Sequence, residues 1–241
     1  MKIPTITGLI ERRILINYQI DAQVLEKYLP KPFHPKIVKE KGIAGICLIR
    51  LKEVRPTGFP KFIGVSSENG AHRIAVEWTD KEGVMREGVF IPRRDTSSKL
   101  NSWAGNKVFS GVHYLANFDV KEENNHYQVS FISKDETSLS IKAKPTHNWN
   151  SESVFESIEE ASDFFEQGRL GYSPIPNKDC FDGLELQTDN WKVHPLEVEN
   201  VHSSFFEDVS IFPKGSIKFD NALLMKNIEH KWIGKKAIKS R

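Results

Sequence analysis

The sequence predicts a mainly antiparallel α+β protein, with many strands joined by short turns and a few short helices. Two observations carry this prediction: apolar and polar positions alternate along much of the chain, and polar turn sequences separate the alternating segments. Such strands close most economically as an antiparallel barrel or sandwich with the helices packed outside. The 241 residues show no internal repeat or composition break, so we expect one domain over residues 1–241.

The first predicted elements are a strand, a short helix and a second strand. Residues 13–20 place their apolar side chains mainly on one face, which is typical of a strand. A helix is expected to begin after Asp21, a favourable N-cap residue, and to end before Pro30 and Pro32. Residues 42–54 begin as an apolar run and end in alternation, which predicts a long strand that enters and leaves the core.

The next segment predicts a long loop, a hairpin and a helix. Residues 55–70 are rich in proline, glycine and polar residues, and a structureless loop of this length often has a functional role. Strands over residues 71–79 and 84–91 are joined by the turn sequence at 80–83, which favours a hairpin. A polar helix is expected over residues 97–107.

The second half of the chain predicts an antiparallel meander, one more helix and a return to strands. The strands of the meander are expected over residues 113–121, 126–133 and 138–144. Ser157 and Glu160 form a capping-box pattern at the start of a helix, and Gly168 provides its C-terminal stop. The clearest of the later strands covers residues 216–226.

Composition argues against several classes of function. The 34 basic and 32 acidic side chains nearly balance, so no electrostatic footprint for nucleic acid is expected. No stretch approaches the roughly 20 apolar residues that span a bilayer, and the N-terminus lacks the pattern of a signal peptide. The two cysteines, Cys47 and Cys180, show no pairing pattern, which indicates reduced thiols in the cytoplasm.

Motifs for common cofactors and nucleophiles are missing from the sequence. It contains no glycine-rich phosphate loop, no Gly-x-Ser-x-Gly elbow and no His-Glu-x-x-His pair. The eight histidines are scattered without ligand-like spacing. We therefore expect neither a metal site nor a cofactor.

Charged residues concentrate between Glu68 and Asp95. This pattern has two interpretations: a network of ion pairs that ties hairpins together, or a cationic pocket for a small carboxylate with an acid available for proton transfer. In the second interpretation Glu68 is the candidate catalytic residue. The candidate ligand-binding residues are Arg12, Arg86, Glu87, Arg93, Arg94 and Asp95.

Two of these segments resemble a known family. Residues 18–33 are similar to the early strand–helix–Pro-x-Pro signature of acetoacetate decarboxylase. Arg86-Glu87, followed four residues later by Pro92-Arg93-Arg94, is similar to that enzyme's Arg-Glu-x-x-x-x-Pro-Lys-Lys.

The resemblance is most specific over residues 12–95 and implies a closed, cone-like β-barrel with an internal pocket. Glu68 falls where the family has its acidic active-site residue, and Arg12 near its substrate-binding arginine. Along nearly its full length the chain also resembles an uncharacterised bacterial group of the same superfamily, a domain of unknown function. The phrases that carry this second likeness lie at residues 71–78, 91–98 and 203–208.

The sequence departs from this family at the residue that performs the chemistry. Acetoacetate decarboxylase forms a Schiff base through one lysine of its Lys-Lys pair. Both lysines are arginine here, Arg93 and Arg94, and a guanidinium stays protonated and forms no imine with a ketone. Lys99 and Lys107 lie nearby in sequence but outside the motif position.

Three functions of different classes remain open. The protein either acts on or binds a small organic acid, or it is a carrier or sensor with the same pocket and no turnover, or its charges are ion pairs of a structural module. The oligomeric state is also open, a homo-oligomer included.

Overall fold

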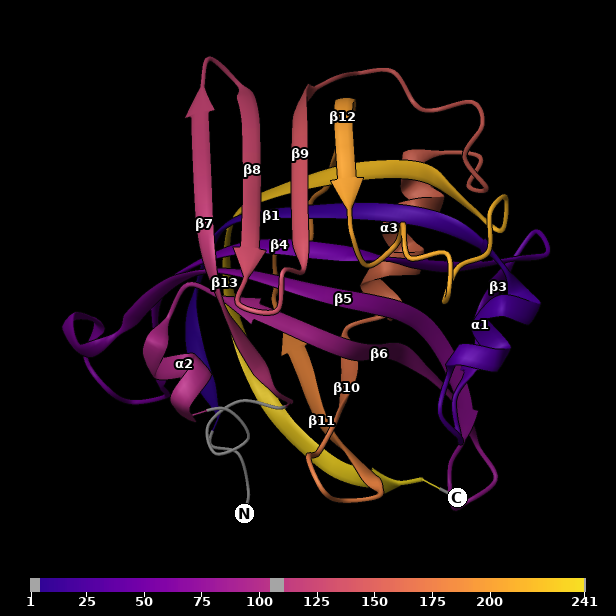
Figure 1. Cartoon of the computed structure of the whole chain (residues 1–241). Coiled ribbons are helices and arrows are strands. Elements are labelled where there is room, and N and C mark those ends of the chain that lie inside the picture. The colour runs from indigo at the N-terminus through magenta and orange to yellow at the C-terminus, as the bar shows by residue number, and fades with distance from the viewer. Residues whose placement is uncertain (1–4, 105–110, 241) are drawn as a thin grey trace.

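A computed structural model describes residues 5–104 and 111–240 of the chain (Figure 1). Its strands are hydrogen-bonded one to the next along a single sheet. The first half contributes β1 (Ile6–Asp21), β2 (His34–Pro35), β3 (Ile37–Val38), β4 (Lys41–Pro56), β5 (Val65–Thr79) and β6 (Met85–Thr96). The second half contributes β7 (His113–Glu123), β8 (His126–Ser133), β9 (Ser138–Pro145), β10 (Leu170–Pro174), β11 (Cys180–Gln187), β12 (His194–Ser203) and β13 (Ile217–Lys239). The predicted mainly antiparallel α+β class is confirmed.

The strand pairings close on themselves in two ways. One ring runs β6–β7–β8–β9–β12–β13–β1–β4–β5 and returns to β6. A second runs from β6 through β10 and β11 to β13 and returns through β1, β4 and β5. The strands β13, β1, β4, β5 and β6 belong to both rings, and Figure 1 shows β1, β4, β5 and β6 running across the view, transverse to the upright strands β7, β8, β9 and β12.

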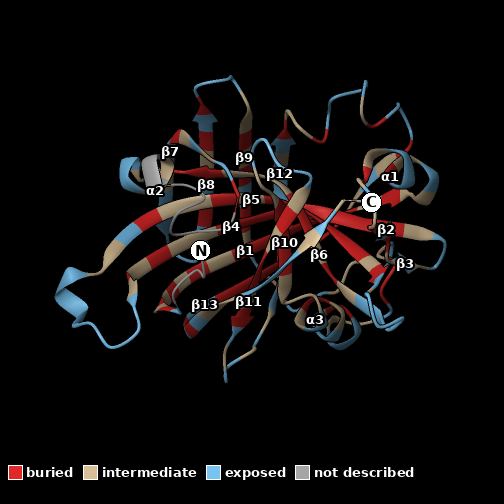
Figure 2. Cartoon of the chain, turned by 90° about the horizontal axis from the view of Figure 1, so that it is seen from below, coloured by how far each residue is buried: buried red, intermediate tan, exposed pale blue. Residues whose placement is uncertain are grey.

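The shared strands bury a different hydrophobic core on each face, and the strand centres are accordingly the most buried parts of the chain (Figure 2). In β1, Ile14 belongs to the first core, whereas Ile10 and Leu15 belong to the second. A register shift against β4 between Ile10 and Arg12 allows two positions separated by an odd number of residues to share a face. Arg12 therefore shares the face of Ile14, and Arg13 shares the face of Leu15.

The helices lie around this sheet. They are α1 (Ala22–Tyr28), α2 (Lys99–Ala104), α3 (Ile158–Gln167) and the 3₁₀ helix η1 (Lys61–Ile63). Helix α3 packs Phe165 against the second core, and Ser157 Oγ accepts the Glu160 amide at 3.2 Å, as the capping box predicts. Asp21 occupies the N-cap position of α1, but its carboxylate accepts a bond from Lys41 Nζ at 2.6 Å in place of a helix amide. None of the described helices is long and apolar enough to cross a membrane.

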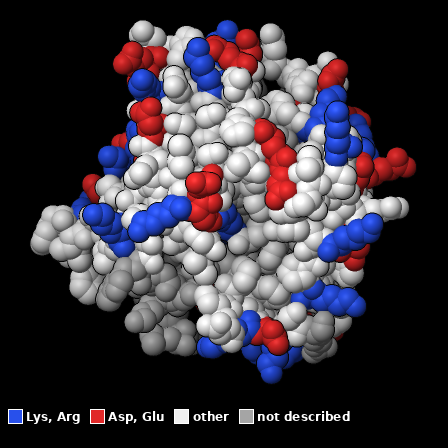
Figure 3. All heavy atoms as spheres, in the orientation of Figure 1, with Lys and Arg blue, Asp and Glu red and all other residues white. Residues whose placement is uncertain are grey.

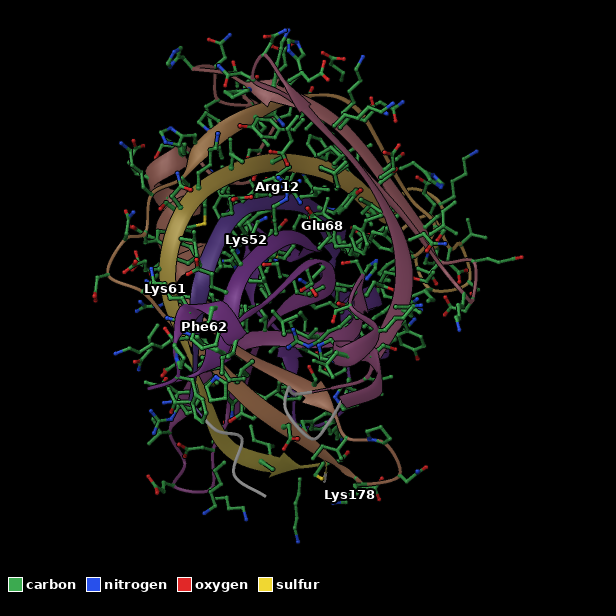
Figure 4. All side chains as sticks on the ribbon, turned by 90° about the vertical axis from the view of Figure 1, so that its left-hand side faces the viewer. Arg12, Lys52, Lys61, Phe62, Glu68 and Lys178 are labelled. Atoms are coloured by element: carbon green, nitrogen blue, oxygen red, sulfur yellow. The ribbon has the colours of Figure 1, made fainter. Side chains whose placement is uncertain are left out.

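Two predicted boundaries are corrected by the structure. The long loop predicted over residues 55–70 is much shorter, because β4 continues to Pro56 and β5 begins at Val65. Phe62 lies at the projecting end of this connection and is 87% exposed (Figure 4). Glu68 consequently lies within a strand and not on a loop. A helix was predicted over residues 97–107, and α2 covers residues 99–104 of it. Residues 105–110, which include Lys107, lie outside the described residues.

Candidate functional site

Arg12 and Glu68 point toward one another within a dense network of ion pairs (Figure 4). Arg12 Nη2 lies 2.5 Å from Glu68 Oε2, and the other Arg12 Nη atom pairs with Glu122. Arg50 pairs with both acids, at 3.0 Å from Glu122 Oε1, and lies 3.5 Å from Glu11. Because Arg12 is only 1% exposed and each acid already accepts two guanidinium groups, this network is internally neutralised.

Arg93 and Asp95 form a second neutralised cluster. Arg93 Nη2 lies 2.7 Å from Asp95 Oδ1, and Arg93 Nη1 lies 2.6 Å from Asp135 Oδ2. Ser133 Oγ donates to Asp95 at 2.5 Å, and the guanidinium lies 4.1 Å from the centre of the Tyr114 ring. Burial raises the pKa of Asp95, although the bonds from Arg93 and Ser133 oppose this effect.

Arg86 and Glu87 lie at the surface beside the β5–β6 hairpin. Arg86 is half exposed and pairs with Asp80 at 2.7 Å, while Glu87 pairs with Lys36 at 2.5 Å. Basic and acidic side chains are also interspersed over the face of the molecule shown in Figure 3. The structure therefore does not bring Arg86 or Glu87 together with the other predicted site residues.

A cavity of about 130 Å³ lies in the second core. Its walls are mainly apolar, and the side chains that form them include Ile10, Leu15, Leu51, Ala75, Phe165 and Leu186. Four arginines and a thiol also line it, namely Arg13, Arg73, Arg94, Arg169 and Cys47. Of the four, Arg169 is paired with Glu166 at 3.6 Å. An apolar cavity with a few convergent polar groups has the usual composition of a ligand site.

The register of the sheet explains how these polar groups meet. Leu15 of β1, Cys47 of β4, Ala71 of β5 and Arg94 of β6 form one continuous row of paired residues across the sheet. Side chains in such a row share one face, and the small side chain of Ala71 leaves space between Cys47 and Arg94.

Arg73 is buried in the wall of this cavity. Its Nη2 donates to the Asn17 side-chain oxygen and its guanidinium lies 4.8 Å from the centre of the Phe165 ring, whereas its Nε has no partner. Burial lowers the pKa of Arg73 to about 10; Cys47 opposes this shift and Arg13 adds to it. The charge of Arg73 is thus held in an apolar environment without a compensating carboxylate.

Arg94 and Arg13 complete the cationic lining. Arg94 Nε donates to Ser173 Oγ at 3.3 Å, and burial lowers the pKa of Arg94 to about 10. Arg13 Nε donates to Cys47 Sγ at 3.0 Å, and its guanidinium lies 5.3 Å from the centre of the Trp191 ring.

Among the described residues, neither Arg13, Arg73 nor Arg94 forms a salt bridge with a carboxylate. Asp95 lines the same cavity but is already paired with Arg93. His113 also lines it, and burial, assisted by the charge of Arg94, lowers the pKa of His113 to about 3. The cavity therefore carries an excess of positive charge near pH 7.

This arrangement suits an anion and does not suit imine chemistry. Guanidinium forks bind carboxylates in bidentate geometry but are neither nucleophiles nor bases at accessible pH. The described residues that line the cavity include no lysine. Within the described ranges, no group of three or more histidine, cysteine or acidic side chains is placed to hold a metal ion.

Of the residues predicted from the sequence, the structure places only Arg94 and Asp95 in the wall of the cavity. Sequence reasoning missed Arg73 and Cys47, which occupy apolar strands. One signal was present for Arg73, because it is charged and shares a strand face with the small apolar residues Ala71 and Ala75, of which Ala75 is buried.

A surface groove of about 560 Å³ is larger than this cavity and is an alternative candidate site. Its charged groups include Arg86 and Lys235, which pair with Asp80 and Glu185 at 2.7 and 2.8 Å. We favour the smaller cavity as the site because its cations are buried and lack such partners.

Comparison with known proteins gives one family match for the chain. Residues 10–217 match the family DUF2071, which is described as an uncharacterized conserved protein. The curated proteins include no significant match.

Solved structures share the fold at low sequence identity. An acetoacetate decarboxylase from Legionella pneumophila superposes with a TM-score of 0.61 at 14% identity, covering 95% of this chain and 86% of that chain. An acetoacetate decarboxylase-like enzyme from Sphingomonas wittichii gives 0.62 at 10% identity, with 100% and 95% covered. The enduracididine biosynthesis enzyme MppR, complexed with pyruvate, gives 0.63 at 6% identity, with 98% and 90% covered. These likenesses establish an acetoacetate decarboxylase-like fold.

Proposed function

This chain belongs to the DUF2071 family of uncharacterised conserved proteins, and from its own geometry we propose that it binds a small organic acid in the cavity lined by Arg13, Arg73 and Arg94. The observation that carries the proposal is the absence of a carboxylate partner for these cations among the described residues. Buried charges in proteins are normally paired, so an unpaired group of three favours an anion as the missing partner.

The size of the cavity supports a guest of roughly six heavy atoms. A cavity of about 150 Å³ in another protein accommodates benzene, and this one measures about 130 Å³. Pyruvate, which is bound to the structural neighbour MppR, has both this size and a carboxylate. We use it as the first probe for this reason, without assigning it as the natural ligand.

The proposal excludes decarboxylation through a Schiff base. The described lining has arginine and no lysine, and a guanidinium forms no imine. Glu68 and Arg12 are paired with each other. Either residue could bind the acid only after this ion pair is broken.

The experiment is a thermal-shift titration with pyruvate, acetoacetate and succinate, with acetone as an uncharged control. A ligand that binds only the folded state at 100 times its Kd adds about 2.7 kcal/mol to stability. We expect a carboxylate to raise the Tm of the wild type and of Arg86→Met, a surface control, but not of Arg94→Met. The proposal is wrong if no carboxylate raises the Tm, or if Arg94→Met responds as the wild type does.

We further propose that the closed strand pairings form a cone-like β-barrel and that residues 1–241 make one domain. The pairing of β1 with β13, which joins Ile6 to Trp232, supports this proposal because it ties the two ends of the chain together. The proposed cytoplasmic location is supported by the two cysteines, both of which are free.

A further inference from the structure

Cys47 is the one thiol among the described residues that line the cavity, and it shares the cavity with Arg13, Arg73 and Arg94. It is 3% exposed and occupies the centre of the row formed by Leu15, Cys47 and Ala71. The Arg13 guanidinium lies on one side, where its Nε donates to Cys47 Sγ at 3.0 Å.

Arg73 and Arg94 lie close enough for the sulfur to affect them. Burial lowers the pKa of each arginine, and the electrostatic interaction with Cys47 opposes that effect at both. In the sheet, Arg94 follows Cys47 and Ala71 in the same row of paired residues. A sulfur that accepts a bond from one guanidinium and shares a cavity with two more meets one condition under which cysteines react, because neighbouring cations favour the nucleophilic thiolate.

A structural role alone does not account for this arrangement. A buried cysteine that only fills space behaves as a small apolar residue and needs no cation beside it. Here the buried Arg73 Nε has no partner, and Arg73 lines the same cavity as the sulfur. The group therefore has the two parts of a reactive site, a nucleophile and a holder for a charged substrate.

We infer that Cys47 is a nucleophile that forms a covalent bond with a small carboxylate held by Arg13, Arg73 and Arg94. The inference rests on the proposed function, since the arginines must first bind the acid. It adds a reacting atom and a substrate class, carboxylates with an electrophilic carbon.

The step balances without a redox partner. With a 2-oxo acid, the Cys47 thiolate attacks the keto carbon and a sulfur–carbon bond forms. The π pair of the carbonyl moves to its oxygen, which takes up, through water, the proton that the Cys47 thiol released, and a thiohemiketal results. The carboxylate remains bound by the arginines throughout, and reversal of the same step releases the acid unchanged.

The experiment compares an anionic with a neutral alkylating agent on the folded protein. Iodoacetate and iodoacetamide both form a sulfur–carbon bond and release iodide, and they differ mainly in the carboxylate. The rate at Cys47 is measured by peptide mass spectrometry, with Cys180 of the same chain, which is partly buried and outside the cavity, as internal control. We expect the ratio of iodoacetate to iodoacetamide rates to be at least tenfold higher at Cys47, and pyruvate to protect Cys47 but not Cys180.

Two variants test the cause of this preference. Arg94→Met is expected to reduce the ratio at Cys47 toward that at Cys180, because it removes one cation of the cavity. Ala71→Val keeps every charge but fills the space between Cys47 and Arg94, and it is expected to slow both reagents equally at Cys47.

Equal ratios at the two cysteines, or no alkylation of Cys47 in the folded protein, would overturn the inference. If carboxylates still raise the Tm in that case, the proposed binding function stands and only the nucleophile is wrong. If neither effect is seen, both proposals fail together.

Discussion

Arg93 and Arg94 are adjacent in β6 but face opposite sides of the sheet. Arg93 is held between Asp95 and Asp135, whereas Arg94 lines the cavity with Ser173 as its hydrogen-bond partner at 3.3 Å. The alternation of side chains along a strand produces this division. Two residues that are indistinguishable in the sequence thus have different electrostatic environments, and their substitutions should have different effects.

The first prediction contrasts Arg93→Met with Arg94→Met. Arg93→Met leaves the fully buried Asp95 without its cation, and loss of one partner of a buried pair costs about 3–5 kcal/mol. Arg94→Met removes an unpaired buried charge, so the free energy of unfolding should be unchanged or higher. Urea unfolding with an unchanged slope measures both. Equal large losses in the two variants would show that Arg94 has a structural partner.

The second prediction concerns Glu68→Gln. Glu68 accepts bonds from Arg12 and Arg50, and loss of a hydrogen bond to a charged group costs about 1.5–3 kcal/mol. Glu122 still pairs with both arginines, which limits the loss. We expect lower stability and an unchanged carboxylate-induced rise in Tm. Unchanged stability with loss of carboxylate binding would return Glu68 to the site as the acid predicted from the sequence.

The strands and helices were largely predictable, because each has a local cause. The hairpin turn between β5 and β6, the β7–β9 meander and the Ser157 cap depend on residues close in sequence, and they form as predicted. The candidate site was less predictable, because the register shift between Ile10 and Arg12 sets which face Arg12 and Arg13 occupy. A one-residue shift exchanges the two faces, and no local pattern specifies it.

The ion-pair partners of the charged side chains could not be predicted from the sequence either. Ion pairs join residues far apart in the chain, as Arg12 and Glu122 show, so the sequence left the network and pocket interpretations open. The structure pairs Arg12, Glu68, Arg93 and Asp95, as the network interpretation expects. It also places Arg94 in the wall of a cavity without a carboxylate partner among the described residues. The proposed anion site therefore rests on Arg94 and not on the paired residues.

The third prediction is that acidification destabilises the protein below about pH 6.5, the ordinary pKa of histidine. Burial lowers the pKa of His72 and His113 to about 3 and that of His230 to about 4. Between these values and 6.5 the unfolded chain binds more protons than the folded one, so stability is complete above pH 6.5 and falls as the pH falls. Each histidine should cost about 2 kcal/mol by pH 5.

Urea unfolding at pH 7 and pH 5 measures this loss, and His72→Phe, beside the Phe205 ring, should reduce it by removing one titrating group. The raised pKa of Asp95 acts in the opposite direction, but it is one group against three. Equal stability at the two pH values would contradict the buried, neutral state of these histidines.

The last prediction uses the two adjacent arginines to test where imine chemistry could be restored. Arg94→Lys places an amine in an apolar cavity beside Arg13 and Arg73, and both burial and like charges lower the pKa of a lysine. Burial already lowers the pKa of Arg94 itself to about 10. We therefore expect borohydride with acetoacetate to attach a stable adduct to Lys at position 94.

The wild type and Arg93→Lys are the matched controls for this experiment. The wild type has no lysine among the described lining residues, and an amine at position 93 would remain paired with Asp95 and Asp135, so neither should give an adduct there. We expect no decarboxylation at the level of a natural enzyme in either variant, because an imine also requires a lysine tuned by its surroundings. A reduced adduct on wild-type Lys99 or Lys107 would contradict the expectation that the site has lost its imine chemistry. An adduct with Arg93→Lys but not with Arg94→Lys would contradict the orientation of the two side chains on which the proposed site depends.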